Sequence, residues 1–181
     1  MNNLPKTYKI KGWNFTFKVP TEKDADALAN FGNKVFSETA FLNRCPADGL
    51  LNHDTQTAYL SKTLSNERNL ILVVECENRI VAQGILTCHS NKIKEKHRAS
   101  LGISVLESFW KLGLGTLLME HLINFASEKQ YEQIELTVIT TNTAAIALYK
   151  KFNFEIVGTN PHAQKLENGK FQDTYSMIKF L

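Results

Sequence analysis

The sequence lacks the marks of several large protein classes. No window holds 18 consecutive apolar residues, so we expect no membrane span. The first residues, MNNLPKTYKIKGWNF, lack the apolar core of a secretory signal. The three cysteines are odd in number and show no C-x-x-C spacing, which argues against a disulfide framework and a thiolate zinc site. A reducing, cytoplasmic location is the simplest expectation.

Metal-ligand and nucleic-acid signals are also missing. The five histidines show neither H-x-x-x-H nor H-E-x-x-H spacing, so we expect no metal site. The net charge is only +3, and no Lys/Arg run exceeds two residues. Aromatic residues are not interleaved with basic ones as a single-strand binder requires. We therefore expect no nucleic-acid partner.

What is present is the composition of one globular domain. The chain has 181 residues, of which 43% are hydrophobic and 22% charged, and it has no repeat, low-complexity stretch or Pro/Gly/Ser linker. We expect a single domain over residues 1–181. The patterning predicts strands at residues 14–19, 69–76, 79–89, 99–106, 133–140, 154–159 and 171–181. It predicts helices at residues 22–37, 54–64, 116–130 and 143–152.

Local signals support several of these elements. Thr21 with Asp24 resembles a capping box at the start of the first helix, and Asn142 occupies the N-cap position of the last. The second helix has a thin apolar stripe of Ala58, Tyr59 and Leu64. The two-residue link Glu77-Asn78 predicts an antiparallel hairpin, and Asn168-Gly169 predicts a later turn.

The order of these elements predicts an α/β (α+β) fold. Strands that follow one another through short links form an antiparallel meander, and one β-α-β crossover lies in the middle. We expect a mixed, mostly antiparallel central sheet of about seven strands with helices on both faces.

Two glycines stand at the entrance of the third helix, in FWKLGLGTLLMEH. The first N–H groups of a helix lack internal partners, so a loop with Gly113 and Gly115 lets an anion approach them closely. Thr116 adds a hydroxyl and Lys111 a cation. A tight turn without ligand is the alternative. The stretch fits neither a P-loop, because no Lys precedes Thr116, nor a dinucleotide fingerprint, because Leu118 replaces the third glycine.

A third pattern fits the stretch, and the chain resembles the GNAT superfamily of N-acetyltransferases. Residues 110–115, WKLGLG, match its motif A, [RQ]-x-x-G-x-[GA], except that Trp110 replaces Arg or Gln. Residues 142–154, NTAAIALYKKFNF, match its second signature, N-x-x-A-x-x-L-Y-x-[KR]-x-G-F, with Asn153 in place of Gly. Asn tolerates the left-handed conformation that such a helix end needs. Residues 37–42, SETAFL, are a softer match to bacterial members.

The resemblance implies acetyl-CoA as cosubstrate. It implies that the main chain of Lys111, Leu112, Gly113, Leu114, Gly115 and Thr116 holds the pyrophosphate. It also implies that Ile103, Ser104 and Val105 pair with the pantetheine amides, with the Ile103 N–H facing the thioester oxygen. From the second signature, Asn142, Ala145 and Tyr149 are implied to contact the cofactor.

Tyr149 is the expected general acid at the departing sulfur. The general base is open, because Ser100 stands where many relatives carry Glu; Glu38, or alternatively Glu75, would act through water. Lys150 and Lys151 either meet the phosphates or are ordinary cations at a helix end.

The resemblance implies direct acetyl transfer to a primary amine in a ternary complex, without a cysteine nucleophile. The acceptor is a small-molecule or protein amine, chosen by residues 21–66 and 159–171. A homodimer is plausible. The alternative is a non-catalytic acyl-CoA-binding sensor or partner module, and a dinucleotide-binding domain is disfavoured by Leu118.

Overall fold

The computed structural model describes residues 4–181, so residues 1–3 of the expected single domain lie outside the described part. The helices are α1 Ala25–Glu38, α2 His53–Leu64, α3 Leu114–Glu128 and α4 Thr143–Lys151. The strands are β1 Lys6–Ile10, β2 Trp13–Lys18, β3 Leu70–Cys76, β4 Arg79–Cys88, β5 Arg98–Val105, β6 Gln133–Ile139, β7 Glu155–Lys165 and β8 Phe171–Phe180.

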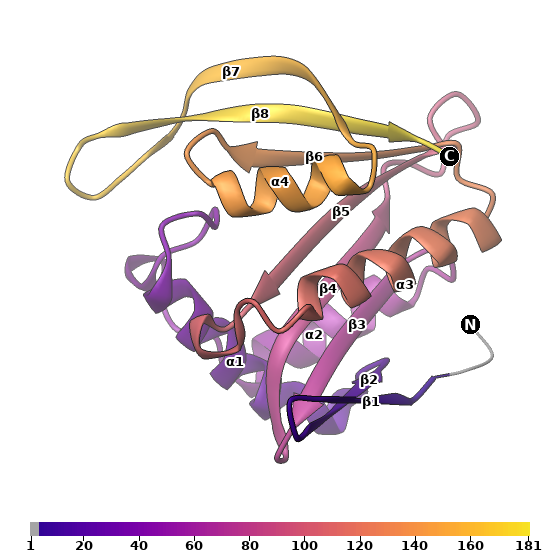
Figure 1. Ribbon diagram of the computed structural model, residues 1–181, viewed down its shortest axis with the longest axis vertical. Helices are drawn as coiled ribbons and strands as arrows, with labels where there is room; N and C mark the ends of the chain where they lie inside the picture. The colour runs from indigo at the N-terminus through magenta and orange to yellow at the C-terminus, as the bar shows by residue number, and fades with distance from the viewer. Residues whose placement is uncertain (1–3) are drawn as a thin grey trace.

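The described strands form one eight-stranded sheet in the order β1-β2-β3-β4-β5-β6-β8-β7. Every neighbouring pair is antiparallel except β5 and β6, which the helix α3 connects as a parallel crossover (Figure 1). The predicted fold class is confirmed. The expected count of seven strands is one too low, because β1 is a short edge strand whose residues are all at least partly exposed, which leaves no long apolar run.

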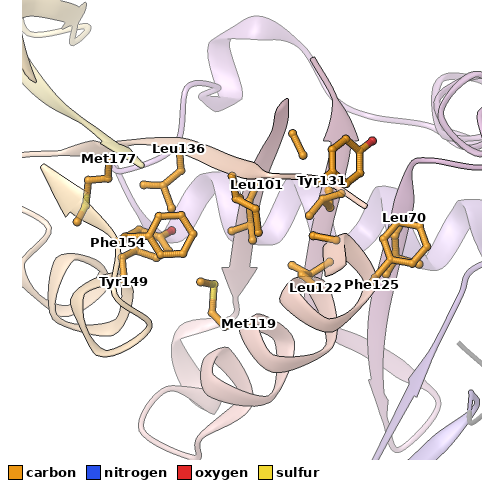
Figure 2. Close-up of a cluster of buried hydrophobic side chains, with 14 of the residues drawn as sticks. Leu70, Leu101, Met119, Leu122, Phe125, Tyr131, Leu136, Tyr149, Phe154 and Met177 are labelled. Carbon is orange, nitrogen blue, oxygen red and sulfur yellow. The ribbon is translucent and has the colours of Figure 1, made fainter. Parts of the chain in front are cut away.

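Helices cover both faces of the sheet, as predicted. The alternating side chains of β3 separate the two faces. Leu72 and Val74 pack in a cluster with Leu118 of α3, and Ile71 and Val73 pack in a cluster with residues of α1 and α2. A third cluster joins α3 to β6, α4 and β8, and Figure 2 shows its members Met119, Leu122, Tyr149 and Met177.

The local signals were mostly confirmed. The Thr21 N–H donates to the Asp24 carboxylate at 2.7 Å, and Asn142 Oδ1 accepts from the Ala145 N–H at 3.1 Å. Asn153 takes the left-handed conformation, with φ 61°. The Glu77-Asn78 hairpin and the Asn168-Gly169 turn are also present.

Three expectations need correction. The predicted apolar stripe of α2 is correct only in part: Tyr59 and Leu64 are half-buried against the cluster of α1 and α2, but Ala58 is exposed. The buried residues of α2 are Gln56, Leu60 and Thr63. These three positions share one helix face, but two of them are polar and therefore gave no apolar signal. The third helix begins at Leu114, two residues earlier than expected. The seventh strand continues to Lys165, past the predicted residue 159, through an irregularity in its pairing with β8.

The sheet opens between its two parallel strands. Pairing between β5 and β6 is confined to Arg98–Ser100 and Gln133–Glu135. Figure 1 shows the strands leaving this shared corner in different directions. The Arg98 guanidinium forms a two-pronged ion pair with the Glu135 carboxylate at this vertex, with Nη2 2.7 Å from Oε2. The fold therefore presents two strand edges that face each other without bonding.

Within residues 4–181, no helix combines the length and the apolar character needed to cross a membrane.

Candidate active site

A cavity of about 650 Å³ lies where β5 and β6 separate. Four parts of the chain line it: the end of α1 with the loop after it, the outer half of β5 with the loop into α3, the end of β6 with α4, and the middle of the β7–β8 hairpin. The site therefore depends on segments from most of the sequence, held in place by the opening of the sheet.

The ends of the β4–β5 ladder show which way the backbone of β5 faces. At one end, the Leu106 N–H donates to the Val81 carbonyl at 3.0 Å. At the other end, the His89 N–H donates to the Arg98 carbonyl at 3.0 Å. The register between these ends has no irregularity. Since backbone groups alternate between the two edges of an antiparallel strand, the even-numbered residues of β5 bond toward β4.

The odd-numbered residues of β5 therefore turn their backbone groups toward the cavity. Ile103 and Val105 offer N–H groups on this edge, beyond the point where β6 stops pairing with it, whereas the Leu101 N–H faces Glu135 in the last step of the β5–β6 ladder. The main-chain groups of Gly102 and Ser104 belong to the β4 ladder. Ser104 lines the cavity, but its backbone does not face it, so the expected pairing of all three residues 103–105 reduces to Ile103 and Val105.

Trp110 occupies part of the same edge, a contact that no motif in the sequence predicts. Its indole Nε1–H donates to the Val105 carbonyl at 2.7 Å, and its ring is 45% exposed and lines the cavity. The carbonyl at the end of β5 is therefore already bonded, whereas the N–H groups of the edge are not. Trp110 stands at the position where motif A has Arg or Gln, so this substitution fixes the start of the loop through a side chain.

The loop from β5 to α3 presents an uncapped helix end to the cavity. The first bond of α3 runs from the Leu117 N–H to the Gly113 carbonyl at 3.1 Å, and no side chain caps the helix. The preceding N–H groups, at Leu114, Gly115 and Thr116, therefore lack partners within the helix. Lys111 lines the cavity beside them, and no acidic residue lies in the first turn. This end of the cavity suits a phosphate-bearing ligand.

The two glycines of this loop have different roles. Gly113 has φ 83°, in the left-handed region, and nothing lies within 4 Å of the place where a Cβ would stand. Gly115 has ordinary helical conformation, but a Cβ there would lie 3.1 Å from Leu148 Cδ2 of α4. Gly113 is therefore required by the backbone, and Gly115 by the close approach of α3 and α4.

Tyr149 lies at the inner wall of the cavity. Its side chain is 6% exposed and packs against Phe154, with ring centroids 5.9 Å apart (Figure 2). Burial raises the pKa of Tyr149 to about 12. No hydrogen bond within residues 4–181 involves its hydroxyl. The phenol therefore stays protonated at neutral pH and has its proton to donate.

Two of the predicted site residues do not line the cavity. Leu112 packs with the apolar cluster beneath α3. Glu38, the last residue of α1, connects this helix to the loop after β5, because its Oε2 accepts from the Glu107 N–H at 2.9 Å. Its Oε1 lies 3.3 Å from Lys34 Nζ in the same helix. The other predicted residues, Ile103, Ser104, Val105, Lys111, Gly113, Leu114, Gly115, Thr116, Asn142, Ala145 and Tyr149, all line it.

The remaining carboxylate and lysine candidates lie elsewhere. Glu75 is ion-paired with Lys18, 2.5 Å away, on the β2–β3 ladder. Lys150 and Lys151 lie in the last turn of α4 and are exposed. The residues 4–181 that line the cavity include no Asp, Glu or His. Within this described part there is also no group of three His, Cys, Asp or Glu side chains that could hold a metal ion.

Comparison with known proteins identifies the family of this architecture. The profile of the acetyltransferase (GNAT) family matches residues 38–154, which is well over half of the chain. The chain therefore belongs to the GNAT family of acetyltransferases.

Individual relatives agree with this assignment. The L-amino acid N-acetyltransferase AaaT of Escherichia coli is 39% identical over 88 residues, 48% of this chain and 53% of that protein. The N-alpha-acetyltransferase 50 of Danio rerio is 33% identical over 89 residues, 47% of this chain and 52% of that protein. The chain thus matches about half the length of these relatives.

Solved structures match over almost the whole fold. An acetyltransferase of the GNAT family from Streptococcus pneumoniae has a TM-score of 0.85 and 31% identity, covering 92% of this chain and 99% of that one. A structure from Salmonella typhimurium, solved with acetyl-CoA, has a TM-score of 0.79 and 18% identity, covering 92% and 94%. At that identity the second likeness concerns the fold alone.

Proposed function

We propose that this chain transfers the acetyl group of acetyl-CoA directly to a primary amine bound in the same cavity. One observation carries the proposal: a free strand edge, an uncapped helix end and a partnerless phenol all face one 650 Å³ cavity. Acetyl-CoA supplies an activated thioester, a chain of amides and a pyrophosphate, and these three features are complementary to those groups. This agreement supports acetyl-CoA as cosubstrate and the main chain of residues 111–116 as its phosphate site.

The chemistry requires a bond from the amine nitrogen to the acetyl carbon and cleavage of the carbon–sulfur bond. The Ile103 N–H lies on the free edge of β5, where it donates to the thioester oxygen and stabilises the charge that develops there. Tyr149 donates its proton to the departing sulfur. The proton lost by the amine leaves through water, because no carboxylate lines the cavity.

Glu38 is our candidate for the final acceptor of that proton, although it is already bonded to the Glu107 N–H and faces Lys34. Two variants separate a base from a purely structural residue. Glu38→Gln keeps an oxygen for the Glu107 N–H but is unable to take up a proton, whereas Glu38→Ala loses both. A base predicts that both variants lower kcat and flatten the acid limb of the pH–rate profile. A structural role predicts that only Glu38→Ala loses activity and that Glu38→Gln keeps the wild-type profile.

A non-catalytic acyl-CoA sensor is the second candidate, and one observation favours it: Ser100 and the cavity wall provide no carboxylate base. Calorimetry with acetyl-CoA and a thiol-release assay over a broad amine panel distinguish the two. Binding with turnover supports the transferase, and binding without turnover on any amine supports the sensor. Absence of binding at millimolar acetyl-CoA would contradict both.

The names of the relatives leave two classes of acceptor. One relative is named for L-amino acids and the other for N-alpha-acetylation. Both acceptors are primary amines, as we propose for this chain. A single domain and a homodimer stay predictions, which light scattering on the purified protein tests.

A further inference from the structure

The charges around the cavity distinguish between acceptor classes. Among the residues 4–181 that line it, Lys111 is the only charged one, and it stands at the uncapped end of α3 where a phosphate would bind. The rest of the wall is apolar or carries neutral amides and hydroxyls. Any positive charge in the cavity is therefore assigned to the cofactor end and not to the acceptor.

Two segments form the wall farthest in sequence from the cofactor loop. The end of α1 and the loop after it contribute Val35, Thr39, Phe41, Leu42 and Asn43. The β7–β8 hairpin contributes Gln164 and Thr174. Figure 1 shows the α1–α2 loop and this hairpin on the same side of the molecule, toward which β5 and β6 diverge. An acceptor that enters here meets no charged side chain.

The cations nearest in sequence to this wall are engaged elsewhere. Lys34 Nζ lies 3.3 Å from the Glu38 carboxylate. Arg44 Nη2 donates to the Gly49 carbonyl at 2.9 Å and to the Asp48 carbonyl at 3.3 Å. Lys165, which follows Gln164, has its Nζ 5.5 Å from the centroid of the Phe171 ring. None of these three side chains lines the cavity. A carboxylate that entered would lose its water without gaining an ionic partner, which is strongly unfavourable.

Neutral amides are available instead. Asn43 and Gln164 each carry an N–H₂ donor and a carbonyl acceptor, and neither side chain has a hydrogen-bond partner within the described residues. An amide group placed between them matches both kinds of atom. Phe41 and Leu42 add apolar surface for a side chain beside the amine.

We infer that the acceptor is an α-amine whose neighbouring carbonyl is in amide linkage, and not a free amino acid. The inference rests on the proposed acetyl transfer and names its substrate class. An amino-acid amide and the N-terminus of a peptide share this chemistry. The occupant of the acceptor side is thus uncharged apart from the amine, and the residue that carries the amine is apolar.

The test compares L-leucine with L-leucinamide, which differ only at the carboxyl group. Thiol release from acetyl-CoA is measured for each across pH, and kcat/KM is expressed per neutral amine, because the two amines titrate differently. We expect leucinamide to exceed leucine at least tenfold. A ratio near one, or a preference for leucine, overturns the inference. The peptide Leu-Ala-Ala distinguishes the sources: a gain over leucinamide indicates a peptide, and a loss indicates a small amide.

A variant pair tests the cause of the preference. Asn43→Arg places a cation on the acceptor wall and is expected to reduce the leucinamide-to-leucine ratio at least tenfold, whereas Asn43→Gln keeps the wall neutral and is expected to keep the ratio above ten. Equal ratios in the two variants contradict the electrostatic cause and overturn the inference.

Binding provides a readout that does not need turnover. Two conjugates, in which an acetyl linker joins the CoA sulfur to the nitrogen of leucinamide or of leucine, are compared by calorimetry. The inference predicts at least tenfold tighter binding of the leucinamide conjugate, and equal binding overturns it. If acetyl-CoA and both conjugates fail to bind, the proposed function itself is wrong. A failure of the proposed function is thus distinguishable from a wrong acceptor class.

Discussion

The Tyr149 side chain combines burial with a free hydroxyl. Most of the ring is held in the cluster that joins α3, α4 and β8, so its position is set by packing. Burial raises its pKa to about 12, which keeps the proton on the oxygen throughout the physiological range. A group of this kind is present as the neutral phenol at physiological pH, so its proton is available to a sulfur anion and it is unsuited to act as a base.

Tyr149→Phe is expected to lower kcat about 10²-fold or more, because the departing sulfur loses its proton donor. The KM for acetyl-CoA changes little, and unfolding free energy changes by less than about 0.5 kcal/mol, because no hydrogen bond within the protein is lost. In the wild type, the phenol loses its proton only as pH rises toward 12, so kcat shows no alkaline decline below about pH 10. Steady-state kinetics and urea unfolding test this, and an unchanged kcat would remove Tyr149 from the mechanism.

Gly113 and Gly115 respond to alanine for different reasons. Gly113→Ala forces a side chain into the left-handed region and is expected to lower the unfolding free energy by roughly 1–2 kcal/mol. Gly113→Asn is the matched control, and it recovers part of the loss because Asn tolerates that conformation. Gly115→Ala changes stability by less than about 1 kcal/mol, because the contact with Leu148 is offset by helix propensity.

The affinity for acetyl-CoA is a more sensitive measure of the role of Gly115 than stability is. A Cβ at Gly115 stands beside the N–H groups at the start of α3, so Gly115→Ala is expected to weaken acetyl-CoA binding about tenfold, a change that calorimetry measures. Gly115→Ala with wild-type affinity would show that the phosphates bind elsewhere.

Among the secondary-structure elements, β5 is the strand that pairs along its whole length on one edge and only in part on the other. It pairs fully with β4 but only through Arg98–Ser100 with β6. The ion pair between Arg98 and Glu135 holds this short contact at the point where the two strands separate. Hydrogen bonds from Arg98 hold the pKa of Glu135 below its ordinary value.

Loss of this ion pair is expected to destabilise the fold in a pH-dependent way. A carboxylate with a lowered folded-state pKa contributes stability that is fully present above its ordinary pKa of 4.5 and is lost as pH falls through the lower folded-state value. Arg98→Gln and Glu135→Gln are each expected to lower the Tm by a few degrees at pH 7 and to converge with the wild type at acid pH. The double variant completes a double-mutant cycle, which isolates the coupling energy between the two side chains. Equal Tm differences at pH 7 and pH 3 would show that the carboxylate charge is irrelevant.

For single elements, the features that depend on neighbouring residues could be predicted from the sequence. The features that depend on contacts between distant elements could not. The Asn142 cap, the turn at Asn153 and the loop around Gly113 depend on a few neighbouring residues, and each was predicted. Eleven of the thirteen predicted site residues also line one cavity. In these cases the chemistry lies within one turn or one loop.

The failures concern positions that other elements determine. The buried face of α2 contains Gln56 and Thr63, whose burial depends on what α2 packs against. Glu38 lies outside the cavity lining because its carboxylate accepts from the Glu107 N–H, 69 residues away in the sequence, and its role as base stays a prediction. The opening between β5 and β6, and the acceptor wall at Gln164 and Thr174, follow from sheet geometry that no local pattern encodes.

The whole molecule consists of two arms that meet at the β5–β6 vertex. The first arm contains β1–β5 and the second contains β6–β8, with α4 following β6 (Figure 1). Acetyl-CoA would bridge them, because its proposed contacts come from β5 and the start of α3 on one arm and from α4 on the other. Ligand that binds only the folded state raises stability, by about 2.7 kcal/mol at a hundred times its Kd.

Hydrogen exchange is expected to show this bridging as an alternating pattern along β5. In the free protein, the amides of Ile103 and Val105 face the cavity and exchange rapidly, whereas those of Gly102 and Ser104 bond to β4 and exchange slowly. Acetyl-CoA is expected to slow the exchange of Ile103 at least tenfold relative to Gly102 and Ser104. Amides of the buried strand β3 serve as the control, because they report only the gain in global stability. Equal protection of odd and even residues would mean that the ligand stabilises the fold without pairing with this edge, and the proposed alignment of the thioester with the Ile103 N–H would then be wrong.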